Sequence, residues 1–230
     1  MSRGVLDLVG NTPIIKLHNV VPDGVAEVWL KFEAGNPTGS YKDRMAMSVL
    51  NNAIDRRDVS PGDTIVEYTG GSTGSSLAFV SAALGLKFVA VFSDAFSQSK
   101  QRTMEAFGAE VIVEESYGKG ITPELIERMK DKALSLCDNS NAYYADQFGS
   151  PDVTLGYEPM GQEIANSLDR NIDIFCASVG TGGAIMGAWQ GLVRSDTKVS
   201  VVAFEPLQSP FLTTGKGGAH KVEGIGVGFD

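Results

Sequence analysis

Hydrophobic and polar positions along the chain follow two different periods. Short apolar runs of the kind that form strands occur at 14–17, 28–32, 64–68, 88–92, 110–114, 172–179 and 199–204. Apolar residues at helical spacing fill most of the intervals between them, after Ser40 and over 73–84, 97–107, 122–136 and 182–193. Strands that alternate with crossover helices predict an α/β fold with mainly parallel sheets, whose ligands bind beyond the carboxyl ends of the strands.

Composition limits the classes of protein that the chain can represent. Its 230 residues are 43% hydrophobic, which is enough to form a sizeable core. Its net charge of −9 argues against a broad surface that binds nucleic acid. The start lacks the apolar core of a signal peptide, and the longest apolar runs are too short to cross a membrane. We therefore expect a soluble, cytoplasmic protein. The polar stretch over 145–153 is the expected seam between two groups of βα units.

Cysteine and histidine are too scattered to build a metal site. Cys137 lies in a polar stretch and Cys176 in the apolar run "IFCASV", so no spacing supports a disulfide or a metal pair, and Cys176 is expected in the core. His18 and His220 are in unrelated segments, which argues against a histidine triad or a zinc site. We expect no metal, so a lysine is the remaining candidate for the reactive side chain.

Two turns between a strand and a helix are rich in glycine. They are "EYTGGSTGSS" at 67–76 and "SVGTGGAIMG" at 178–187. Backbone amides at a helix N-terminus favour phosphate or carboxylate, although such turns also serve tight packing of a helix on a strand. A dinucleotide-binding fingerprint fails because Ile185 stands where its last glycine belongs, and the chain has no Walker A pattern.

One lysine lies where a helix is expected to begin. In "KFEAGNPTGSYKDRMA", at 31–46, a turn precedes Ser40 as the predicted N-cap, and Lys42 follows in the first turn of the helix. The positive helix end should lower the pKa of Lys42 and make its amine a better nucleophile in a dry site. The alternative is a solvated surface lysine paired with Asp43 or another nearby acid.

Six collinear motifs carry a resemblance to a known family. "GNTPIIKL", "KFEAGNPTGSYKDR", "TGGSTGSSLA", "FGAEV", "SVGTGGAIMG" and "EGIGVGF" span Gly10 to Phe229 and resemble the pyridoxal-phosphate enzymes of fold type II, most of all the cysteine synthases, or O-acetylserine sulfhydrylases. The resemblance implies that Lys42 forms the Schiff base with pyridoxal 5'-phosphate. It places the cofactor phosphate on Gly180, Thr181, Gly182, Gly183 and Ala184, and the substrate α-carboxylate on Thr69, Gly70, Gly71, Ser72, Thr73 and Gln147. It also puts Ser72 near the cofactor ring and Gly224 in the wall of the site.

The resemblance also carries expectations about architecture and activity. It implies two three-layer αβα domains of the tryptophan synthase β-like fold, a smaller one of residues 1–13 plus 36–148 and a larger one of 14–35 plus 149–230. The implied reaction is β-replacement, which forms L-cysteine from O-acetylserine or a related activated serine and sulfide, with Lys42 as the base that takes the α-proton. Two alternatives stay open: a serine or threonine dehydratase or other β-eliminating relative, and an inactive truncated scaffold. The implied partners are a second copy, giving a homodimer in a family-length form, and a serine acetyltransferase.

The chain departs from the family pattern in four ways. Ser72 replaces a usual asparagine at the cofactor's phenolic oxygen, Gly70 replaces a usual serine, and Ala184 replaces a usual threonine beside the phosphate. We therefore expect the cofactor contacts or the choice of acceptor to differ. Relatives also continue past Phe229 and there supply a hydroxyl group to the pyridine nitrogen, so the chain is expected to be a fragment.

Overall fold

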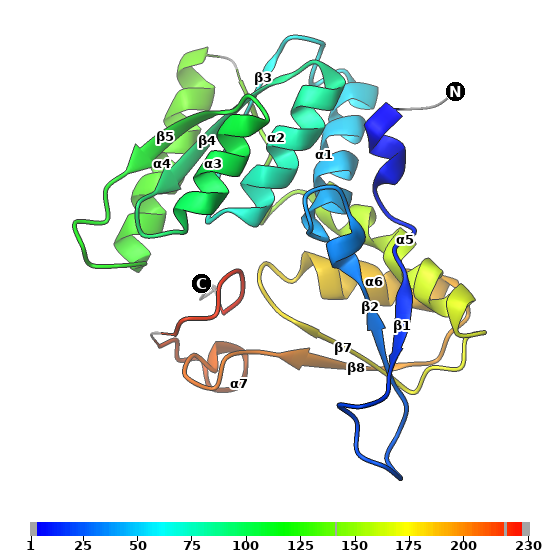
Figure 1. Ribbon diagram of the computed structural model, residues 1–230. Helices are drawn as coiled ribbons and strands as arrows, with labels where there is room; N and C mark the ends of the chain where they lie inside the picture. The colour runs from blue at the N-terminus through cyan, green and yellow to red at the C-terminus, as the bar shows by residue number, and fades with distance from the viewer. Residues whose placement is uncertain (1–3, 141, 219, 227–230) are drawn as a thin grey trace.

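The computed structural model describes residues 4–140, 142–218 and 220–226, which form helices and strands in alternation (Figure 1). The strands are β1 (Ile14–Leu17), β2 (Val28–Lys31), β3 (Thr64–Tyr68), β4 (Lys87–Ser93), β5 (Glu110–Glu114), β6 (Tyr143–Tyr144), β7 (Ile174–Ser178) and β8 (Ser200–Phe204). The α-helices are α1 (Lys42–Arg56), α2 (Ser72–Leu84), α3 (Gln98–Ala106), α4 (Pro123–Ser140), α5 (Pro151–Ser167), α6 (Gly183–Arg194) and α7 (Phe211–Thr214). Two short 3₁₀ helices are η1 (Gly4–Leu8) and η2 (Glu33–Gly35).

A parallel sheet with the strand order β5-β4-β3-β6 forms the centre of one half of the molecule. Its side chains alternate between two apolar clusters, as the two-residue period of a strand requires. Ile65 and Phe88 pack towards α1 and α2, whereas Val66, Tyr68 and Val91 pack towards α4. Helices therefore cover both faces of this sheet, and the prediction of an α/β fold with a parallel sheet is confirmed.

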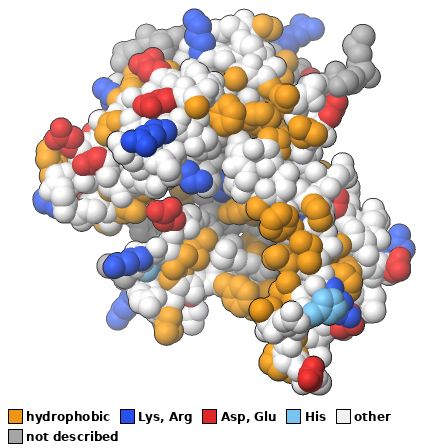
Figure 2. Space-filling view, viewed as in Figure 1, with side chains coloured by type: hydrophobic (Ala, Val, Ile, Leu, Met, Phe, Trp, Pro, Cys, Tyr) orange, Lys and Arg blue, Asp and Glu red, His pale blue; other side chains and the backbone are white. Residues whose placement is uncertain are grey.

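The other half contains two smaller sheets. Strands β7 and β8 are parallel, with Ile174 opposite Ser200, and β1 pairs with β2 in antiparallel register. All five residues of β8 are exposed, and hydrophobic side chains gather over this lower part of the molecule in Figure 2. Cys176 is exposed on β7, so its predicted place in the core is wrong. Within the described residues, nothing covers the face of β7 on which Cys176 lies.

Helices α5 and α6 pack closely because glycine lines their contact. A Cβ atom added to Gly161, Gly187 or Gly191 would lie 2.0–2.2 Å from a backbone oxygen of the opposing helix. No side chain fits at such a distance, so the two backbones are nearly in contact. Helix α6 begins at one of the predicted anion turns, and this contact therefore helps to place that turn.

Most predicted elements are found within two residues of their expected bounds. The apolar pattern did not indicate β6, α5, α7 or the two 3₁₀ helices, and α4 ends at Ser140, four residues beyond its expected end. Helix α5 begins at Pro151, inside the polar stretch taken as a seam, and contains Gly156 and Pro159. Both residues disfavour an isolated helix, so burial of one face of α5 against α1 and α6 must supply its stability. None of the helices in the described part of the chain has the length and hydropathy needed to cross a membrane.

Candidate active site

Lys42 is the first residue of α1, and its side chain is buried. Only 8% of the residue is exposed, which contradicts the alternative of a solvated surface lysine. The assigned N-cap is Tyr41 rather than the predicted Ser40, but the hydroxyl oxygen of Ser40 accepts a hydrogen bond from the Lys42 amide at 3.2 Å. Burial lowers the pKa of Lys42 to about 8, and the nearby charge of Glu67 opposes that shift. Desolvation is therefore the main cause of the lowered pKa, and the amine is a better nucleophile and base near neutral pH.

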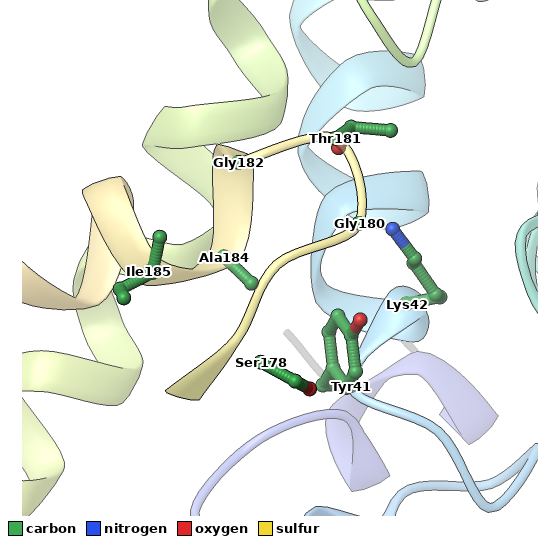
Figure 3. Close-up of a pocket in the computed structure, with 8 residues that line it drawn as sticks. All are labelled: Tyr41, Lys42, Ser178, Gly180, Thr181, Gly182, Ala184 and Ile185. Carbon is green, nitrogen blue, oxygen red and sulfur yellow. The ribbon is translucent and has the colours of Figure 1, made fainter. Parts of the chain in front are cut away.

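The glycine turn after β7 faces this amine. Figure 3 shows the Lys42 nitrogen directed towards Gly180, across a small pocket. Gly182 is the N-cap of α6 and has a φ of +83°, a conformation that glycine adopts without strain. The pocket is lined by Tyr41, Lys42, Ser178, Gly180, Thr181, Gly182, Ala184 and Ile185. The structure thus brings together Lys42 and four of the five residues predicted to bind phosphate, and Gly183 follows them as the first residue of α6.

This pocket suits a group that carries both an aldehyde and a phosphate. The Lys42 amine is almost fully enclosed and lies 5.2 Å from the centre of the Tyr41 ring, and no hydrogen bond or ion pair to another side chain is found for it among the described residues. A Cβ on Gly182 would meet no atom within 4 Å, so the turn is open on that side. The first amides of α6 lack intrahelical partners and carry the positive end of the helix dipole, which favours an anion there.

The second glycine turn, between β3 and α2, is braced from within. Thr69 is buried, and its hydroxyl oxygen accepts hydrogen bonds from the amides of Gly71 at 3.0 Å and Gly74 at 3.1 Å. Gly71 has a φ of +139°, which L-residues rarely adopt. Thr69 therefore holds the shape of this loop, which is a different use of its hydroxyl from the predicted contact with substrate.

Two glycines of this loop leave room for the close packing of neighbouring side chains. A Cβ on Gly70 would lie 2.8 Å from the ring of Phe96, and a Cβ on Gly71 would lie 2.7 Å from the side chain of Lys100. Phe96 precedes α3 and Lys100 is part of it, so α3 fits closely against the bare backbone of the loop. The packing alternative for glycine-rich turns thus applies here, whereas Gly182 faces open space.

Gln147 lies beside the loop, as the resemblance predicts. Its side-chain oxygen accepts a hydrogen bond from the Thr73 hydroxyl at 2.7 Å, and its side-chain nitrogen donates to the Tyr68 carbonyl at 3.1 Å. Its backbone amide donates to the Glu67 carboxyl group at 3.0 Å. Residues far apart in the sequence are therefore joined in one network at the end of β3.

Gly224 lies against the other turn. Its carbonyl oxygen is 2.6 Å from the position that a Cβ on Gly180 would occupy, which places it at the wall of the pocket. The amide of Gly226 donates to the Val179 carbonyl at 3.1 Å and fastens this segment to the end of β7. The last three residues of the motif "EGIGVGF" lie outside the described residues.

A cluster of four charged side chains anchors α1 near Lys42. Arg44 is only 3% exposed and forms two hydrogen bonds of 2.8 Å to Glu163 on α5 and two more, at 2.7 and 2.8 Å, to Glu33. Lys31 on β2 adds an ion pair of 2.7 Å to Glu163. Burial alone would raise the pKa of Glu163, but hydrogen bonds from Arg44 and Lys31 lower it to about 2. This ion cluster joins β2, η2, α1 and α5.

Sequence reasoning missed two parts of this arrangement. The ion cluster joins residues more than a hundred positions apart, and no local pattern marks such a pairing. Glu67 did leave a signal, because it is an acid inside the apolar strand "TIVEY". An acid that interrupts a buried strand requires a compensating partner, and this rule could have identified it.

Comparison with known proteins gives evidence of the chain's family that does not depend on the geometry of the site. The pattern of the family described as pyridoxal-phosphate-dependent enzymes matches residues 5–230. A cysteine synthase of Staphylococcus aureus (strain Mu50 / ATCC 700699) is 38% identical over 229 residues, which cover 98% of this chain and 71% of that protein. Among solved structures, a cysteine synthase from Entamoeba histolytica is 31% identical with a TM-score of 0.89, over 100% of this chain and 68% of that one. An O-ureido-L-serine synthase is 32% identical with a TM-score of 0.88, over 96% of this chain and 68% of that one.

Proposed function

The chain belongs to the family of pyridoxal-phosphate-dependent enzymes, and from that premise we propose that it forms L-cysteine from O-acetylserine, or a related activated serine, and sulfide. The observation that carries the proposal is the buried amine of Lys42, which lies over the Tyr41 ring and is directed towards the open glycine turn at Gly180. A ligand with an electrophilic carbon at one end and an anion at the other uses both features.

The residues for holding the cofactor follow from this geometry. Lys42 would attach pyridoxal 5'-phosphate covalently, and the amides of the turn at 180–184 would bind its phosphate. When bound, the cofactor supplies an electron-withdrawing ring that makes the substrate Cα–H bond acidic. Ser72 is half-buried at the start of α2, where it is proposed to replace the usual asparagine.

The protein's own groups then bind the substrate and move its proton. The amides of the loop over 69–73, together with Thr73 and Gln147, are proposed to bind the α-carboxylate. Thr73 now donates its hydroxyl hydrogen to Gln147, so a carboxylate would replace the Gln147 oxygen as the acceptor of that hydrogen bond. The Lys42 nitrogen, with a pKa of about 8, is suited to take the proton from the substrate Cα near neutral pH.

Product analysis tests the proposed reaction. Incubation with O-acetylserine and sulfide is expected to give cysteine, detected as a new thiol, at a rate that depends on sulfide. Formation of pyruvate from serine without any need for sulfide would instead support a β-eliminating enzyme. A protein that takes up no cofactor, seen as the absence of visible absorbance after incubation with pyridoxal 5'-phosphate, would support the inactive scaffold. Because one structurally similar protein is an O-ureido-L-serine synthase, the assay should also test nucleophiles other than sulfide.

The two glycine turns are expected to respond differently to substitution. Gly182→Asp should weaken cofactor retention, because a carboxylate would project into the open side of the phosphate turn and the φ of +83° would strain any side chain. Thr73→Ala should spare the cofactor and raise KM for the amino acid. Loss of one charge-assisted hydrogen bond should lower kcat/KM roughly tenfold to a hundredfold. Cofactor absorbance after dialysis, measured beside steady-state kinetics, separates the two effects, and equal cofactor loss in both variants would contradict the assignment.

The proposal includes features that the resemblance implies for the wider setting. These are a cytoplasmic location, a homodimer and a serine acetyltransferase partner, and sedimentation with and without that partner tests the last two. We also propose the division into residues 1–13 plus 36–148 and 14–35 plus 149–230. Two separate parallel sheets support this division, because each half then has a sheet of its own.

A further inference from the structure

Glu67 is a fully buried acid at the end of β3 that the proposed chemistry does not use. None of its surface is exposed, and its two carboxyl oxygens accept hydrogen bonds from the backbone amides of Tyr68 and Gln147, each at 3.0 Å. Its strand neighbours Ile65 and Val66 are apolar core residues. A buried acid is costly where an apolar residue would fit, so its position requires a specific explanation.

We propose that Glu67 is a positioning residue for the loop that binds the substrate carboxylate, acting through Gln147 and Thr73. This inference rests on the proposed function, because it assumes that the loop receives the amino-acid substrate. Glu67 itself does not touch substrate. It fixes the glutamine that holds the Thr73 hydroxyl in the free site, before a carboxylate replaces that glutamine as the acceptor.

The hydrogen bonds form a closed path around the end of β3. From Glu67 the path passes to the amide of Gln147, then from the Gln147 side-chain oxygen to Thr73 at 2.7 Å. The Gln147 side-chain nitrogen returns to the Tyr68 carbonyl at 3.1 Å. Gln147 is therefore held by its backbone through Glu67 and by its side chain through Tyr68. Without the first of these bonds, the backbone of Gln147 itself would lose its tie to β3, and the nearest remaining backbone bond to that strand would be from the Ala145 amide to the Val66 carbonyl.

Burial and nearby charges act on the pKa of the Glu67 carboxyl group in opposite directions. Burial raises the pKa of Glu67 to about 8 and the charge of Asp146 acts in the same direction, whereas the amides of Gln147 and Tyr68 and the charge of Lys42 lower it. The titratable groups whose charges interact with Glu67 are Lys42, Tyr68, Cys137, Tyr144 and Asp146. Both oxygens of the ionised carboxylate accept from the backbone amides, and the carbonyl oxygen of the neutral acid still accepts, so at least one of the two hydrogen bonds persists in either protonation state.

A double-mutant cycle tests the inference on the enzyme loaded with cofactor. Glu67→Gln keeps the shape of the side chain but turns an NH₂ group towards one of the two amides, so at most one hydrogen bond survives. Glu67→Gln and Thr73→Ala should each raise KM for O-acetylserine about tenfold, with a smaller change in kcat. The double variant should resemble Thr73→Ala alone, because Glu67 is proposed to affect KM only through the Thr73 hydroxyl. Amide hydrogen exchange at 145–149 should become faster in Glu67→Gln, in the presence or absence of cofactor.

The outcomes separate this inference from the proposed function. If KM changes from the two variants multiply in the double variant, or if Glu67→Gln leaves KM unchanged, Glu67 does not act through Thr73 and the inference is overturned. If Thr73→Ala itself leaves KM unchanged, the loop is not the carboxylate site and the proposed function loses its substrate contact. If Glu67→Gln lowers only the melting temperature, the residue serves folding alone and the positioning role is refuted.

Discussion

Lys42→Ala is expected to abolish covalent attachment of pyridoxal phosphate and to lower turnover by about 10³-fold or more. The amine is both the attachment point and the proposed base, and loss of a general base alone is worth 10²–10⁴-fold. Far-ultraviolet circular dichroism should hardly change, because alanine is a good helix former at the start of α1. Borohydride reduction followed by peptide mapping measures the attachment directly, and in the parent protein the label should lie on Lys42.

Two other lysines provide matched controls for this prediction. Lys31 is held in an ion pair with Glu163, and the side chain of Lys100 packs over Gly71. Lys100→Ala removes a lysine near the loop without removing the amine that faces the turn, so it should leave attachment intact. Label found on Lys31 or Lys100 in the parent protein would refute the assignment of Lys42.

Gly161→Ala is expected to destabilise the fold by at least about 3 kcal/mol, the upper part of the range for overpacked cores. Its new methyl carbon would lie 2.0 Å from the Ala188 carbonyl oxygen, and a backbone atom cannot move aside as a flexible side chain can. The helices α5 and α6 must separate to relieve the contact. Thermal unfolding should show a fall in Tm of roughly 6–12 °C, from the scaling for a chain of this size.

Gly217→Ala is the control for that substitution. Gly217 does not have a positive φ, and the nearest atom to an added Cβ is the Ser209 hydroxyl oxygen at an ordinary 3.7 Å. Its Tm should therefore stay within about 2 °C of the parent value. Similar falls in Tm in both variants would mean that the close approach of α5 and α6 is not the cause of the lost stability in Gly161→Ala.

The parts of the fold that follow local rules could be predicted from the sequence. Strand β3 is a short and mostly apolar run, and the glycine cluster after it marks where α2 begins. Lys42 could be singled out because a lysine is unusual in the first turn of a helix, although the cause of its lowered pKa is burial, which depends on packing by distant segments. Element type and the main candidate residue were thus available from the chain alone.

Features that depend on contacts between distant segments could not be predicted. Helix α5 contains glycine and proline at positions that disfavour an isolated helix, and its stability comes from α1 and α6. Cys176 is in an apolar run, but apolar character does not reveal which face of a strand another element covers. The glycines at 70 and 71 suggested a ligand, and the sequence did not reveal that Lys100 of α3 and Phe96, which precedes α3, pack against them.

The ion cluster around Arg44 determines how accurately the two sides of the pocket are aligned. Lys42 and Arg44 are two residues apart on α1, and Arg44 is bonded at two points to Glu163 on α5. Helix α5 in turn touches α6, whose first residue follows Gly182. The route from the amine to the turn at Gly182 therefore passes through two contacts between helices, α1 with α5 and α5 with α6. Because only two contacts between helices separate the amine from the turn, a shift of either helix changes the distance between them directly. The spacing of the two groups therefore depends on how closely α1, α5 and α6 pack.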